Sequence, residues 1–137
     1  MYLLDTNVVS ELRRASCDAN VRAWVDAQLP TSLFLSAITL LELEIGVLRV
    51  ERKDQAQGER LRDWLQHNVR PAFAGRILPF DESVAMRCAQ LHVPDPKSER
   101  DASIAATAIV HGMSVVTRNL NNFQGTGVPL VDPWRAR

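Results

Sequence analysis

The chain has 137 residues, of which 46% are hydrophobic and 23% are charged. These fractions are those of a globular protein and exclude a long disordered chain, and we expect residues 1–137 to form a single domain. Sixteen basic and sixteen acidic residues give a formal net charge of zero. This balance excludes a protein coated with positive charge, so any nucleic acid has to bind at a local site.

The cysteines and the first residues indicate where the protein works. Cys17 and Cys88 lie far apart and lack the spacing of a zinc site or a redox motif, which favours a reducing compartment. The start of the chain, Met1–Asp5, lacks the basic segment and apolar run of a signal peptide. No apolar run approaches the ~18–20 residues of a transmembrane helix. We therefore expect a cytoplasmic protein that has no contact with membranes.

Short apolar runs alternate with helical periods along the chain. In chain order the pattern predicts strand 2–4, helix 8–14, helix 21–29, strand 33–35, helix 36–50, a helix through 61–65 that ends near 71, strand 76–79, helix 81–91, helix 98–111, strand 114–117 and strand 128–131. Pro129 has no N–H for an inner ladder, so the last strand is expected at an edge. This alternation predicts a layered α/β fold around a mainly parallel sheet of four to five strands.

Three acidic residues occupy positions that suit a functional site. Ligands gather at the carboxyl ends of parallel strands, and Asp5 directly follows the first predicted strand. Glu42 lies one turn after Thr39 on the helix that Ser36 opens, and it borders the side that we expect to be buried, which carries Ile38, Leu41 and Ile45. Asp101 emerges from the small, apolar face of an alanine-rich helix, so this carboxylate needs a partner.

Three carboxylates that a fold brings together repel one another, and each gains a higher pKa unless a cation neutralises the group. A set of oxygen ligands without Cys or His favours Mg²⁺ or Mn²⁺ over zinc. Such a cation lowers the pKa of water and stabilises negative charge on a phosphate, which suits the hydrolysis of a phosphodiester. The three acids together therefore indicate nuclease chemistry.

Each acid also has an ordinary structural explanation. Thr39-x-x-Glu42 and Ser98-x-x-Asp101 both match a capping box, in which the acid helps to satisfy the start of a helix. Asp5 also suits the role of a helix cap. Spacing alone does not separate capping from catalysis at any one of these positions.

The order and separation of five segments add a different kind of evidence. Together they resemble a PIN domain of the VapC/FitB type, and the resemblance covers nearly the whole chain. The segments are Leu4–Leu12 (LDTNVVSEL), Ser36–Gly46 (SAITLLELEIG), Asp101–Ala108 (DASIAATA), Thr117–Asn119 (TRN) and Asp132–Trp134 (DPW).

The resemblance implies a three-layer α/β/α fold and the activity of a metal-dependent endoribonuclease. Members of that family are the toxins of toxin–antitoxin pairs, so the expected partners are a cognate antitoxin, an RNA substrate and a second copy in a homodimer, with a higher assembly formed with the antitoxin. The family's metal-binding acids correspond to Asp5, Glu42 and Asp101 here, with Mg²⁺ or Mn²⁺ as the cofactor. The resemblance assigns supporting or substrate-positioning roles to Thr6, Asn7, Ser36 and Thr39.

The loop after the fourth predicted strand departs from the family pattern. Family members often carry a fourth acid there, within a pattern like TRDxxDF, whereas this chain has Asn119 and Asn122 at the two acidic positions. An amide oxygen ligates a cation without supplying negative charge, so we expect one well-held metal rather than two. Asn119 is the better candidate for the fourth position because it lies nearer the end of the strand.

Two other functions remain open. The missing fourth acid would suit a PIN-like module that binds protein or nucleic acid and has weakened or lost catalysis. An aspartyl-phosphate phosphatase of the haloacid dehalogenase type also has an Asp after its first strand. That class expects a second Asp two positions later, where this chain has Asn7.

Overall fold

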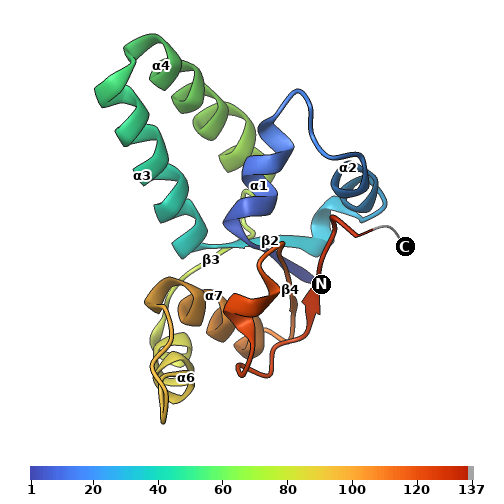
Figure 1. Cartoon of the computed structure of the whole chain (residues 1–137), viewed down its shortest axis with the longest axis vertical. Coiled ribbons are helices and arrows are strands. Elements are labelled where there is room, and N and C mark those ends of the chain that lie inside the picture. Colours follow the sequence, from blue (N-terminus) through green and yellow to red (C-terminus); the bar gives the residue numbers. More distant parts are fainter. Residues whose placement is uncertain (136–137) are drawn as a thin grey trace.

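A five-stranded, fully parallel sheet forms the centre of the computed structural model, which describes residues 1–135. The last two residues of the expected domain, 136 and 137, lie outside the described residues. The spatial order of the strands is β3-β2-β1-β4-β5 (Figure 1). Their bounds are β1 Tyr2–Leu4, β2 Leu33–Ser36, β3 Ile77–Leu78, β4 Ser114–Val116 and β5 Leu130–Val131.

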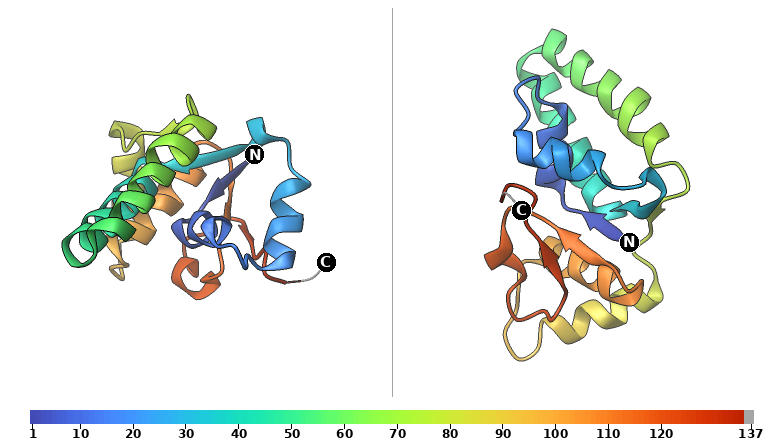
Figure 2. Two further views of the ribbon diagram at one scale, coloured as in Figure 1. Left: turned by 90° about the horizontal axis from the view of Figure 1, so that it is seen from above. Right: turned by 90° about the vertical axis from the view of Figure 1, so that its right-hand side faces the viewer.

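Both faces of the sheet are covered, because successive strand residues point to opposite sides. Leu4 and Val116 belong to one hydrophobic core, whereas the preceding residues Leu3 and Val115 belong to a second core on the other face. Helices pack on each of these cores, and the layers are visible in Figures 1 and 2. The chain therefore has the α/β/α architecture with a parallel sheet that the sequence predicts.

One helical layer covers the face that carries Leu4. It contains α1 Thr6–Arg13, α2 Ala19–Asp26, α3 Ala37–Lys53, α4 Gln55–Trp64 and α5 Arg70–Ala72, with 3-10 turn η1 Pro30–Ser32 before β2 and the wide helical turn η2 Leu65–Val69 between α4 and α5. Helices α3 and α4 form an antiparallel hairpin that extends beyond the sheet (Figure 1). The bidentate ion pair of Arg62 with Glu44 links these two helices.

The opposite layer consists of α6 Glu82–Leu91 and α7 Glu99–Val110, followed after β4 by the 3-10 turn η3 Leu120–Phe123. Helix α7 lies between the sheet and α6. Its small side chains contact both neighbours, since Ala105 and Ala108 join the sheet core while Ala102 and Ala106 pack against Val84 of α6. The alanine-rich segment that carries Asp101 is therefore a helix buried from two sides.

Several predicted boundaries shift for identifiable reasons. Helix α1 begins at Thr6, two residues earlier than predicted, because Asp5 caps it. The helical segment expected to end near Pro71 does end there, since α5 closes at Ala72 and Pro71 occupies an early position of this short helix that requires no N–H. The last strand lies at an edge as predicted.

The expected buried side of α3 is wrong. The buried residues of this helix are Thr39, Leu43 and Val47, whereas Leu41 is 45% exposed. Leu43 and Val47 join the core formed with α1 and the sheet, and this packing rotates Leu41 outward. Within residues 1–135, no helix combines the length and apolar character that crossing a membrane requires.

Alanine substitutions at two glycines of the α3–α4 hairpin are expected to have opposite effects on the free energy of unfolding. A Cβ atom at Gly58 would lie 2.6 Å from the Cα atom of Glu51, whereas a Cβ at Gly46 would meet nothing within 4 Å. We expect Gly58→Ala to lower the free energy of unfolding by about 1–3 kcal/mol. We expect Gly46→Ala to raise it by about 0.5–1 kcal/mol, the ordinary gain of alanine inside a helix. Urea denaturation measures both, and a gain at Gly58 would contradict the close approach of the helices.

Candidate functional site

The candidate site lies where the connections of the sheet change direction. From β1 the chain adds β2 and then β3 on one side, whereas β4 and β5 lie on the other side. The carboxyl ends of β1 and β4 are therefore at a topological switch point, the place where ligands bind in open parallel sheets. Asp5 follows β1 and Thr117 follows β4, so these two side chains meet there.

Asp5 is the most enclosed of the three acids, with 6% of its surface exposed. Its Oδ2 atom accepts a hydrogen bond of 2.8 Å from the Thr117 hydroxyl and one of 3.2 Å from Asn7 Nδ2. Its Oδ1 atom accepts a 2.8 Å bond from the backbone N–H of Thr6. These donors hold the carboxylate in one orientation and compensate part of the cost of burying it.

Glu42 reaches the same region from the second turn of α3. Thr6 Oγ1 donates a 2.7 Å hydrogen bond to Glu42 Oε1 and lies 3.2 Å from Thr39 Oγ1. The other carboxylate oxygen, Oε2, lies 3.7 Å from Nη1 of Arg100. Both oxygens of Glu42 therefore have a partner, one from α1 and one from α7.

Asp101 enters the site from the first turn of α7. Ser98 caps this helix, and its Oγ atom accepts a long 3.5 Å contact from the Asp101 N–H. Partial burial raises the pKa of Asp101, a hydrogen bond from Ser98 opposes this, and repulsion from Glu42 adds to it. Asp101 thus lies within the electrostatic reach of Glu42, which is on a different helix.

The Asp5 carboxylate has a raised pKa for the same kinds of reason. Burial is the largest cause, the hydrogen bonds from Thr117 and Thr6 oppose it, and repulsion from Asp101 and Glu42 raises the pKa further. The three acids of β1, α3 and α7 therefore form one electrostatic group. Hereafter Asp5, Glu42 and Asp101 are called the acid cluster.

Comparison with known proteins identifies the family of this chain. A family model described as PIN domain matches residues 2–127. The chain belongs to the PIN domain family. The curated relative named VapC ribonuclease Y4jK, from Sinorhizobium fredii, is 40% identical over 142 residues, which cover 98% of each chain.

Solved structures of PIN domains share the whole fold. The crystal structure of FitAcB from Neisseria gonorrhoeae matches with a TM-score of 0.92 and 38% identity, over 99% of this chain and 100% of that one. A toxin-antitoxin complex from Klebsiella pneumoniae matches with a TM-score of 0.72 and 26% identity, over 99% of this chain and 100% of that one. The resemblance to the VapC/FitB type is thus confirmed, and the matches give no support to the phosphatase alternative.

The PIN domain brings most of the predicted site residues together. Thr6, Asn7 and Thr39 surround the acid cluster through the contacts given above. Ser36 directly precedes α3. Its hydroxyl accepts a 2.9 Å hydrogen bond from the Ile38 N–H, so Ser36 serves as the cap of this helix. Asn119 is exposed, and its backbone N–H donates to Thr117 Oγ1 at 3.0 Å. Its contact with the site is therefore made through the backbone.

Sequence reasoning missed two residues of this site. Thr117 is fully buried and donates to Asp5, and it ends the fourth predicted strand, so the rule that identified Asp5 applies to it as well. Arg100 forms an ion pair with Glu42. No short-range sequence pattern predicts that contact, because the two residues lie on different helices.

The capping explanation holds for Asp5, holds at α7 for Ser98 but not for the Asp101 carboxylate, and fails at Thr39. Asp5 caps α1, and Ser98 caps α7 with Asp101 at the third helical position. The proposed box of Thr39 and Glu42 is wrong, because α3 begins at Ala37 with Ser36 as its cap. Capping therefore does not explain why Glu42 faces the other two acids.

The donor set of the acid cluster fits a hard divalent cation. The cluster offers carboxylate oxygens, which Mg²⁺ and Mn²⁺ prefer, and a cation would relieve the repulsion that raises two of the pKa values. Within residues 1–135, no three His, Cys, Asp or Glu side chains already converge closely enough to hold a metal ion. Glu42 is held by Thr6 on one oxygen and by Arg100 on the other.

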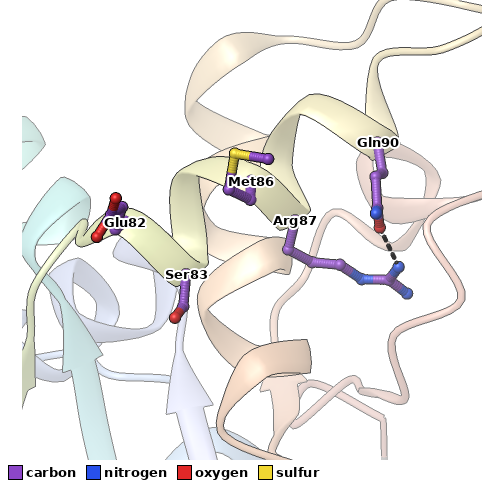
Figure 3. A pocket seen from close by; sticks show the side chains of 5 residues that line it. All are labelled: Glu82, Ser83, Met86, Arg87 and Gln90. Atoms are coloured by element: carbon purple, nitrogen blue, oxygen red, sulfur yellow. Dashed lines mark hydrogen bonds between the residues drawn. The ribbon is translucent and has the colours of Figure 1, made fainter.

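Two surface hollows differ in their relation to the acid cluster. A groove of about 230 Å³ between α1, α3 and α4 begins at Thr6 and Glu42 and continues along apolar side chains toward Trp64. A hollow of about 570 Å³ lies on α6 instead, beside Met86 and the hydrogen-bonded pair Arg87 and Gln90 (Figure 3). No residue of the acid cluster lines the second hollow.

The raised pKa values predict how stability depends on pH. Above the ordinary value of 3.8 and up to the raised values, folded Asp5 and Asp101 bind more protons than they do in the unfolded chain. Their contribution to the free energy of unfolding therefore falls as pH rises through this window. We expect the stability of Asp101→Asn relative to wild type to increase as pH rises above 3.8, as measured by urea denaturation.

Glu44 provides a contrast of opposite sign. Its hydrogen-bonded ion pair with Arg62 lowers its pKa below the ordinary 4.5, so its contribution is present above 4.5 and is lost as pH falls through the lowered pKa. Glu44→Gln should therefore be less stable than wild type above pH 4.5. Unlike Asp101→Asn, it should not become more stable relative to wild type as pH rises. A stability difference between Asp101→Asn and wild type that does not change with pH would contradict the raised pKa that burial and the repulsion from Glu42 give to Asp101.

Proposed function

We propose that this PIN domain is a metal-dependent endoribonuclease that hydrolyses RNA phosphodiester bonds, and that it is the toxin of a type II toxin–antitoxin pair. The observation that carries the proposal is the acid cluster at the carboxyl end of β1, where burial and mutual repulsion raise the pKa of two carboxyls. Without a cation, the repulsion among these carboxylates lowers the stability of the fold. Their presence at one place therefore indicates a functional role. The relative named VapC ribonuclease supports RNA as the substrate.

In this proposal Asp5, Glu42 and Asp101 hold Mg²⁺ or Mn²⁺. The cation, when bound, supplies Lewis-acid stabilisation of phosphate charge and lowers the pKa of water. Thr117 and Asn7 fix the direction of the Asp5 oxygens, and Thr6 does the same for Glu42. These hydrogen-bond donors fix the orientation of the carboxylates that would bind the cation. Less reorganisation is then needed when the cation and the RNA bind.

The proposed partners follow from the same relationship. The structural match to a toxin-antitoxin complex supports a cognate antitoxin, with which a homodimer of this chain would form a larger assembly. Residues 1–137 act as a single domain in this proposal. The substrate is cellular RNA, so the proposal includes action in the cytoplasm.

The acid cluster predicts metal-dependent cleavage that fails when a carboxylate is neutralised. We expect the purified chain to cut a structured RNA pool with Mg²⁺ or Mn²⁺ and to stop when EDTA is added. Asp5→Asn, Glu42→Gln and Asp101→Asn should each lower the cleavage rate by more than the ~10–100-fold that changes to the hydrogen-bond donors around them cause. Asp81→Asn is the matched control, because Asp81 caps α6 as Asp5 caps α1 but lies outside the acid cluster.

A second candidate function has one observation in its favour. The positions of the family's fourth acid hold Asn119 and Asn122, both exposed, so the loop adds no negative charge to the site. A PIN domain that only binds its partners would show weak Mn²⁺ binding and no cleavage, from folded protein that is free of any antitoxin. That result would contradict the proposed nuclease activity.

The buried Thr117 hydroxyl predicts a separate effect on the same reaction. Thr117→Val keeps the shape of the side chain but removes the 2.8 Å hydrogen bond to Asp5. We expect metal affinity or cleavage rate to fall by ~10–100-fold, with substantial recovery in Thr117→Ser, which restores the hydroxyl. Mn²⁺ titration and cleavage assays measure the two quantities. Equal activity in Thr117→Val and wild type would show that this bond does not orient Asp5.

A further inference from the structure

Arg100 makes an ion pair that neither the fold nor the proposed chemistry requires. Its Nη1 atom lies 3.7 Å from Glu42 Oε2, and the side chains are 49% and 26% exposed, respectively. Within residues 1–135 this is the one ion pair that involves a member of the acid cluster. A cation of the chain itself is thus placed at the mouth of the site.

The position of Arg100 is unfavourable for helix stability. It lies in the first turn of α7, where the helix dipole favours anions and disfavours a cation. Its neighbours Glu99 and Asp101 suit that end of the helix, whereas Arg100 does not. An ion pair this exposed also contributes little to folding. Helix capping and structural stability therefore leave the arginine unexplained.

Arg100 reaches the acid cluster through Glu42 on a neighbouring helix and not through the adjacent Asp101. Consecutive residues of a helix point in different directions, so Arg100 and Asp101 do not face each other. Helices α3 and α7 are in contact (Figure 1). The Nη1 atom of Arg100, on α7, lies 3.7 Å from Oε2 of Glu42, on α3. Glu42 is then held between Thr6 on one oxygen and Arg100 on the other.

We propose that Arg100 is a phosphate-binding residue that Glu42 holds in reserve until a divalent cation enters the acid cluster. The proposal rests on the proposed nuclease function. Arg100 and the cation compete for Glu42, because each neutralises the same carboxylate. Once the cation holds Glu42, the guanidinium is free at the exposed edge, where its forked donors suit a phosphate of the RNA backbone.

The first consequence concerns metal binding and needs no RNA. Removing the competing guanidinium should tighten Mn²⁺ binding, so we expect calorimetric titration to give a dissociation constant up to about fivefold lower for Arg100→Ala than for wild type. Arg22→Ala is the matched control, because Arg22 is 48% exposed and pairs with Asp26 at 4.0 Å, away from the acid cluster. Its dissociation constant should equal that of wild type.

The second consequence concerns the substrate. We expect Arg100→Ala to raise KM for a single-stranded RNA substrate by about tenfold, with kcat within about twofold of wild type, because a charged hydrogen bond to phosphate is lost. The slope of log KM against log salt should decrease by about 0.7–1, the change expected for one phosphate contact. Arg100→Lys keeps the charge and should recover the salt slope.

The outcomes separate this inference from the function on which it rests. If wild type binds Mn²⁺ and cleaves RNA but Arg100→Ala matches Arg22→Ala in metal affinity, KM and salt slope, Arg100 is a surface residue and the inference is wrong. Weaker Mn²⁺ binding in Arg100→Ala would also overturn it, because that result would show support of the site rather than competition. If wild type neither binds Mn²⁺ nor cleaves, the proposed function fails and the inference fails with it. A circular dichroism melt of each variant verifies that it is folded.

Discussion

Repulsion among three carboxylates is the constraint around which the site is built. Asp5 is almost fully buried, and this burial is the main cause of its raised pKa, to which repulsion from Asp101 and Glu42 adds. Much of the surrounding structure opposes that cost. Thr117, Asn7 and the Thr6 N–H donate to Asp5. Asp5 and Asp101 also lie at the N-termini of α1 and α7, where the helix dipole favours negative charge. The charge is moderated but not removed, so a cation that enters the site gains a favourable interaction.

The parallel sheet explains why these acids meet at all. Strand β1 is central, and the chain leaves it toward β2 and β3 before it returns on the other side as β4. After Asp5 and Thr117, the chain continues from β1 and from β4 into opposite layers. Helices from both layers therefore reach the site between these two connections. Helix α3 brings Glu42 from one layer, and α7 brings Asp101 from the other. Residues distant in sequence thus share one site because of strand order alone.

Much of this was predictable from local patterns, and the parts that were not share one physical reason. The strand ending at Leu4 placed Asp5, and the alanine-rich segment placed Asp101 on a buried helix. The capping box at Thr39 failed because Ser36, which is also the predicted start of this helix, caps α3. The outward turn of Leu41 and the Arg100 contact both depend on how helices distant in sequence pack, which no window of neighbouring residues contains.

The helix caps of this site have a consequence for how such a sequence changes over generations. Asp5 caps the start of α1 while it belongs to the acid cluster, whereas the cap of α7 is Ser98. A descendant that no longer needed to cleave anything would still use the Asp5 side chain as a helix cap. Glu42 and Asp101 have no such second role, since Glu42 lies inside α3 beyond its cap and the side chain that caps α7 is that of Ser98. Under relaxed selection for activity, Glu42 and Asp101 would therefore change first, and their loss would mark a retired member of the lineage sooner than the loss of Asp5.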